Sequence, residues 1–91
     1  MAVVSREDLA AYCRLDEDVL IDAAVKLSEQ MERRLTRKGA VDSPATHDDF
    51  CLTVKAMTLH ELDHPGEKIP QGIQDMINEL KLVKHGRRNA V

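Results

Sequence analysis

Aromatic side chains are almost absent from this chain, since Tyr12 and Phe50 are the only two in 91 residues. The interior must therefore be built from Leu, Ile, Val, Met and Ala, which suit helices packed on helices better than a β-sandwich. A chain of this length is expected to form one domain, residues 1–91, that buries roughly 60–65% of its unfolded surface. The core is consequently small, and association with other subunits would help to stabilise it.

The charge balance and the cysteines argue against several classes of protein. A formal net charge of −3 is unusual for a general nucleic-acid binder, which carries a basic excess. Cys13 and Cys51 lie far apart in the sequence and fit neither a disulfide framework nor a zinc site, so we expect both to be reduced. No apolar run is long enough to span a bilayer, and the opening MAVVSRED lacks a signal peptide's apolar stretch, which predicts a cytosolic compartment.

Capping residues and apolar spacing predict two helices in the first half of the chain. Ser5 and Asp8 have the spacing of a capping box, and the helix that they begin should end near Arg14. For the longer second helix we expect Asp16 to be the N-terminal cap and Gly39 to provide the stop. The apolar stripe of this second helix consists of Leu20, Ala23, Ala24, Leu27, Met31 and Leu35.

A polar loop over residues 39–45 is expected before a third helix. Thr46 and Asp49 have capping-box spacing, and Pro65-Gly66 must end the helix just after His64. Its wide apolar face indicates a central position in the fold. The face consists of Phe50, Cys51, Val54, Met57, Thr58 and Leu62.

Pro70 is suited to the first position of a fourth helix, which Gly86 can end. Its stripe consists of Ile73, Met76, Ile77 and Leu80. We therefore predict an all-α fold, a small four-helix domain with a long second helix and a mobile tail from about residue 86 to 91. The second and third helices should form a central antiparallel pair. The residues predicted to be buried are Leu20, Leu27, Met31, Val54, Met57, Ile73 and Ile77.

The segment His60-Glu61-Leu62-Asp63-His64 matches the H-E-x-x-H pattern, in which two histidines bind zinc and the glutamate activates a water. The context argues against that chemistry. Asp63 places a charge between the two histidines, Pro65-Gly66 ends the helix at once, and a chain this small has little material for a cleft. His47 and His85 could supply a third ligand only by chance of folding. We interpret the motif as an exposed last helical turn, and expect no catalytic residue, no metal and no cofactor.

Charged residues gather at both ends of the predicted second helix, and this gives the candidate subunit interface. The acidic cluster is Asp16, Glu17 and Asp18, and the basic cluster is Arg33, Arg34, Arg37 and Lys38. Both clusters complement the dipole of their own helix. They also offer two unlike surfaces, which a closed ring of identical subunits requires.

Three segments, in this order, resemble the gp6-like head–tail connector (adaptor) family of tailed phages and prophages. The opening VSREDLAAYCRLDEDVLIDAAVKLSEQMERRL resembles the family's short helix, acidic turn and long helix. DDFCLTVKAMTLHELDH is similar to its apolar helix that ends around a His. IPQGIQDMINELKLV resembles its final Pro-x-Gly-Ile segment and short helix. The chain departs from the family where aromatic residues usually follow the His, and at the end of the second helix, Leu35 to Gly39.

The resemblance implies a structural role in the virion, at the head–tail junction, after assembly in the host cytoplasm. It implies a homo-oligomeric ring of about a dozen copies. Such a ring would bind below the portal protein, extend the DNA channel and receive the tail or a stopper protein. DNA would be transiting cargo only, with which an acidic wall is compatible, and no membrane would be involved.

Three other interpretations remain open from the sequence. The first is a generic small helical interaction or regulatory module that forms no ring. The second is a metal-dependent hydrolase built on His60, Glu61 and His64. The third is a helix–turn–helix DNA-binding protein, which is disfavoured by the long loop between the second and third helices and by the acidic surface.

Overall fold

The computed structural model describes residues 3–84, with the side chains of residues 3–81, and this part of the chain is all-helical. Its helices are α1 (Arg6–Cys13), α2 (Asp18–Arg37), α3 (His47–Asp63) and α4 (Gln71–Lys84), with no strand among the described residues. The predicted all-α, four-helix fold with a long second helix is confirmed. Gly86, His85 and the tail predicted to be mobile lie outside the described residues.

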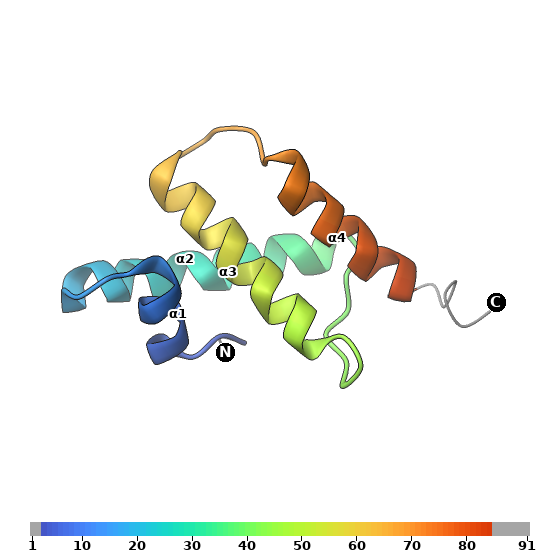
Figure 1. Ribbon diagram of the computed structural model, residues 1–91, viewed down its shortest axis with the longest axis horizontal. Coiled ribbons are helices and arrows are strands. Elements are labelled where there is room, and N and C mark those ends of the chain that lie inside the picture. The colour runs from blue at the N-terminus through green and yellow to red at the C-terminus, as the bar shows by residue number, and fades with distance from the viewer. Residues whose placement is uncertain (1–2, 85–91) are drawn as a thin grey trace.

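The most extensive helix–helix contact joins α2 and α3, as expected for a central pair. The two helices run in opposing directions but cross obliquely instead of lying side by side along their lengths (Figure 1). α1 packs beside the N-terminal half of α2 and against α3, while α4 returns along α3 on the side away from α1 (Figure 1). The N-terminal half of α2 therefore extends beyond the crossing, with α1 as its neighbour.

The core is aliphatic around one aromatic ring, as the composition requires. Its fully buried side chains include Leu9, Leu35, Phe50, Val54, Met57 and Ile77. Three buried hydroxyls bond to carbonyls of the preceding turn: Ser28 Oγ to Val25 O at 2.7 Å, Thr53 Oγ1 to Asp49 O at 2.7 Å and Thr58 Oγ1 to Val54 O at 2.8 Å. Because these groups are satisfied within their own helices, small polar residues can occupy the core without an unpaired donor.

The buried face of α2 differs from the predicted stripe. It consists of Ile21, Ala24, Ser28, Met31 and Leu35. Leu20 and Ala23 are exposed and Leu27 is only partly buried, so the prediction of Leu20 as a core residue is wrong. Ser28 can lie on the buried face because its hydroxyl donates to Val25 O of the same helix. A pattern based on hydrophobicity alone does not identify such a serine as buried.

The other residues predicted for the core are buried or partly buried. Met31, Val54, Met57 and Ile77 are buried, as expected, and Ile73 is partly buried against the same cluster.

The helix ends confirm some predicted caps and correct others. The Ser5 hydroxyl accepts from Asp8 N at 3.1 Å, as predicted for the start of α1. Asp16 is not the cap of α2, because the N-cap residue is Glu17 and it forms no side-chain capping bond. Arg14, whose φ of 56° is left-handed, ends α1 before that turn.

Thr46 precedes α3 without a side-chain cap, so the predicted capping box with Asp49 does not form. Its hydroxyl instead donates to Val41 O at 2.9 Å and accepts from Ser43 N at 3.1 Å, which closes the loop before α3. The hydroxyl is therefore used by the loop and not by the helix.

Glycine and proline end the helices where the sequence predicts. α2 stops before Gly39, which has φ +109°, and α3 stops at Asp63, just before Pro65-Gly66. Pro70 lies immediately before α4, one residue earlier than predicted, and its carbonyl accepts from Gln74 N at 3.0 Å. In the described part of the chain, no helix has the length and apolar character to cross a membrane.

Candidate subunit interface

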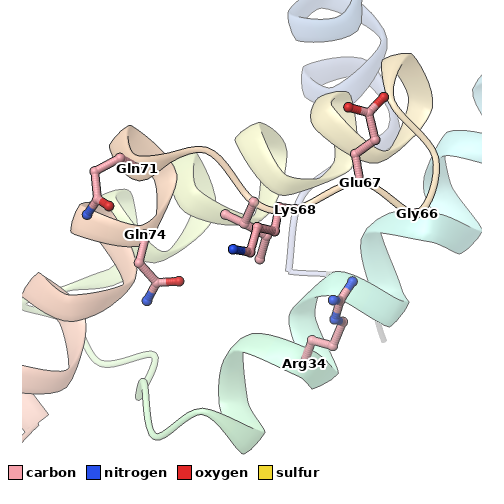
Figure 2. Close-up of a pocket in the computed structure, with 7 residues that line it drawn as sticks. Arg34, Gly66, Glu67, Lys68, Gln71 and Gln74 are labelled. Carbon is pink, nitrogen blue, oxygen red and sulfur yellow. The ribbon is translucent and has the colours of Figure 1, made fainter.

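A hollow of about 570 Å³ lies between the C-terminal half of α2 and the connection from α3 to α4. Arg34 lines it from α2, and residues 66–69 line it from the connection. Gln71 and Gln74 complete it from the first turns of α4 (Figure 2). The hollow therefore joins three segments that are distant in the sequence.

Local turn chemistry positions the connection. The Gly66 amide, at a left-handed φ of +76°, donates to Glu61 Oε2 at 3.0 Å, and Glu67 N donates to His64 O at 3.1 Å. This turn places Lys68 opposite Arg34 (Figure 2). The end of α3 and the start of α4 thus shape one wall of the hollow.

Two cations, Arg34 and Lys68, line this hollow. The carboxylate of Glu67 points away from Arg34 in Figure 2, and His64 Nδ1 lies 3.3 Å from Glu67 Oε2. The amide nitrogens of Gln71 and Gln74 bond along α4, to Asp75 at 2.8 Å and Asn78 at 3.3 Å. The hollow is consequently suited to a carboxylate, which a guanidinium can bind with two parallel hydrogen bonds.

The other residues of the predicted basic cluster lie on a different face. Arg33 and Arg37 line a smaller hollow of about 280 Å³ with Glu32 and Thr36. Lys38, which is exposed, is the C-cap residue of α2. The four predicted cations therefore lie on more than one surface, and of the four only Arg34 lines the same hollow as Lys68.

The predicted acidic cluster is divided as well. Asp18 and Asp22 both bind the Arg6 guanidinium, with Arg6 Nη2 at 3.3 Å from Asp18 Oδ1. The hydrogen bond that Arg6 donates to Asp22 is the main cause that raises the pKa of Arg6 above its ordinary value. Asp16 and Glu17 are exposed beyond this cluster. The two clusters lie at opposite ends of α2, which at 20 residues is about 30 Å long.

An exposed apolar pair accompanies the acidic end. Val19 is 76% exposed and Leu20 is 46% exposed, on the part of α2 that extends beyond the crossing with α3. This surface was not predicted from the sequence, because the apolar spacing of α2 places Leu20 in the core. Leu52 on α3 and Val41 in the preceding loop are exposed to a similar extent, 42% and 44%.

The H-E-x-x-H segment forms the last turn of α3. The His60 and His64 rings lie with centroids 5.5 Å apart, and His60 Nε2 is 3.4 Å from Glu67 O. The Glu61 carboxylate, which would activate a water in a metalloprotease, accepts from the Gly66 amide. Within residues 3–81, no group of three or more His, Cys, Asp or Glu side chains is arranged to hold a metal ion.

The chain matches no protein-family model, no curated protein and no solved structure.

Proposed function

We propose that this protein is a structural subunit of a phage head–tail connector ring, which binds below the portal, extends the DNA channel and joins the head to the tail. The single observation that carries the proposal is the pair of unlike surfaces at opposite ends of α2. One is acidic with exposed apolar side chains, and the other is a hollow lined by cations. No catalytic step is part of this function.

The sequence resemblance supports the proposal through the order of its segments. The first resembling segment, residues 4–35, covers α1 and most of α2. The second, residues 48–64, lies on α3, and the third, residues 69–83, begins two residues before α4 and covers nearly all of it. Each segment of the resemblance therefore corresponds to a structural unit of the chain.

The two ends of α2 support ring closure because they are complementary and not alike. In a ring, one surface of each subunit meets a different surface of the next. Asp16 and Glu17 of one copy would approach Arg34 and Lys68 of the next. Exposed ion pairs contribute only about 0–1 kcal/mol each, so charge would set the orientation. Burial of Val19 and Leu20 would supply most of the affinity.

The experiment is a measurement of mass in solution, by native mass spectrometry or sedimentation, for the chain alone and with a portal ring. We expect a closed oligomer, or a ring that forms on the portal. A chain that stays monomeric at every concentration and binds no portal would contradict the proposal and favour a helical interaction module without ring assembly.

A matched pair of variants tests which surface makes the contact. Leu20→Lys should weaken assembly, because it places a charge in the apolar part of the proposed contact. Leu52→Lys is the control, since Leu52 is nearly as exposed but lies on α3. Equal behaviour of the two variants would show that the acidic end of α2 is not the contact.

A further inference from the structure

The hollow between α2 and the connection from α3 to α4 is larger than a single carboxylate group can fill. Its volume of about 570 Å³ lies within the range of small-molecule sites, roughly 300–1,000 Å³. In the proposed ring it would receive Asp16 and Glu17 of the next copy. Arg34 and Lys68 are both exposed in the separate subunit, so a small anion from solvent can reach them as well.

The charges of Arg34 and Lys68 are not compensated within the subunit. Neither side chain forms an ion pair with a carboxylate of residues 3–81, whereas Arg6 is paired with two aspartates. Arg34 Nη1 lies 3.7 Å from Met31 Sδ, and a thioether is only a weak acceptor. The remaining N–H groups of the guanidinium are therefore available to a ligand.

The walls of the hollow strengthen the attraction for an anion. Among the described residues that line it, Glu67 alone is acidic, and its carboxylate points away from Arg34 and lies 3.3 Å from His64 Nδ1 (Figure 2). Ile69, which is partly buried against the core, supplies an apolar part of the wall. Charges of one sign beside a wall of low dielectric constant raise the local concentration of the opposite ion.

The side chains of the hollow also indicate the kind of anion. A guanidinium binds a carboxylate or a phosphate group with two parallel hydrogen bonds, and an ammonium adds a compact charge. Because Lys68 lies opposite Arg34, a ligand with two anionic groups can match both cations (Figure 2). Neither aromatic residue of the chain lines the hollow, since Phe50 is buried in the core and the Tyr12 ring lies beside Lys55. A nucleobase would therefore find no ring on which to stack.

We propose that the hollow binds a small anion with two charged groups, a diphosphate or a dicarboxylate. Arg34 would hold one group through its fork of N–H donors, and Lys68 would hold the other. A bound anion would occupy the place of Asp16 and Glu17, and would therefore weaken ring formation. That regulatory effect rests on the proposed function, whereas the binding of the anion does not.

The test is a titration of the full-length chain with pyrophosphate and, separately, with malonate. The amide chemical shifts are followed by NMR at constant ionic strength, at a protein concentration where the chain is monomeric. We expect saturable shifts at residues 66–69 with at least one of the two anions. The anion that binds more tightly shows whether the ligand is of the phosphate or the carboxylate class.

Matched variants separate a site from general attraction to a basic surface. Arg34→Gln should weaken binding by about 10–100-fold, because it removes charged hydrogen bonds, and Lys68→Gln should weaken it as well. Arg33→Gln makes the same change of net charge on the other hollow and should keep the affinity. The amide spectrum of each variant shows whether it is folded.

Absence of saturable shifts with both anions, an unchanged affinity in Arg34→Gln, or an equal loss in Arg33→Gln would each overturn the proposal. Sedimentation with pyrophosphate, compared with sodium chloride at the same ionic strength, measures the effect on the ring. A ring that is unaffected by the bound anion would refute the competition. A chain that binds the anion but forms no ring would refute the proposed function and leave the anion site in place.

Discussion

Polarity and burial disagree in two regions of α2, near its N-terminus and on its buried face. The N-terminal half carries Val19 and Leu20, yet both are exposed. The buried face of α2 carries Ser28, which is polar and yet only 1% exposed. Neighbouring helices, and not the hydrophobicity of the stretch itself, therefore decide which side of α2 is buried.

The buried and the exposed residues of α2 have different roles. The buried face of α2 stabilises the subunit, whereas Val19 and Leu20 leave apolar area available for contact with another subunit. Isolated exposed apolar residues are ordinary on protein surfaces. Here they lie next to Asp16 and Glu17, which gives the surface a charge as well as an apolar part.

A buried and an exposed leucine of α2 should differ most in their contribution to stability. Leu35→Ala should lower the free energy of unfolding by about 2–5 kcal/mol, because it leaves a cavity at a fully buried position. Leu20→Ala, the same substitution at an exposed position, should change the free energy of unfolding by only about 0.5 kcal/mol or less. Urea unfolding at a concentration where the chain is monomeric measures both. Similar losses would contradict the burial of Leu35 and the exposure of Leu20.

A second substitution reverses the usual expectation from hydrophobicity. Ser28→Leu adds an apolar side chain and raises helix propensity, but should destabilise the fold by about 1–3 kcal/mol, because Ser28 is almost fully buried and a larger side chain would overpack the core. Leu20→Ser, which removes apolar area from an exposed position of α2, should destabilise the fold by about 0.5 kcal/mol or less. Denaturant midpoints decide between them, and a stabilised Ser28→Leu would place Ser28 outside the core.

The sequence allowed the helices and their ends to be predicted because Gly39, Pro65-Gly66 and Pro70 restrict the backbone locally. It did not allow the buried face of α2 to be predicted. Ser28 is a polar residue, but its hydroxyl bonds to Val25 O of the same helix and can therefore be buried. The stripe that began at Leu20 was the more hydrophobic choice. Burial depended on packing against the neighbouring helices, which no local pattern contains.

The caps and the candidate interface show the same limit. Ser5 caps α1 because its partner is three residues away, whereas Thr46 bonds within the loop that precedes α3. The charged clusters could be found from the sequence. The hollow could not, because Arg34 and Lys68 line it together only as a result of the turn after α3.

The end of α2 gives a prediction of intermediate size. Gly39 has φ +109°, so Gly39→Ala should destabilise the fold by about 1–2 kcal/mol through backbone strain. Gly72→Ala is the control, because Gly72 is helical and an added Cβ would meet no atom within 4 Å. That variant should be neutral or up to about 1 kcal/mol more stable. Thermal unfolding of both variants checks the prediction, and equal losses would contradict it.

The smallest effect per interaction, and the sharpest test of the two ends of α2, comes from charge reversal. Arg34→Glu should weaken ring formation, because it places a carboxylate beside the incoming Asp16 and Glu17. Arg33→Glu is the matched control, since Arg33 faces the other hollow and lies away from Lys68. Each pair contributes only about 0–1 kcal/mol, so the loss should be clear at low salt and small at high salt.

The rescue experiment reverses the partner residues. Asp16→Lys with Glu17→Lys should restore assembly to Arg34→Glu, because opposite charges would again face each other across the contact. Asp18 is left unchanged, since it binds Arg6 within its own subunit and its reversal would disturb α1. Sedimentation at two salt concentrations measures the outcome. Assembly that is unchanged in Arg34→Glu would mean that both clusters serve only their own helix dipole, whereas rescue by the acidic-end variant would place the two ends of α2 together.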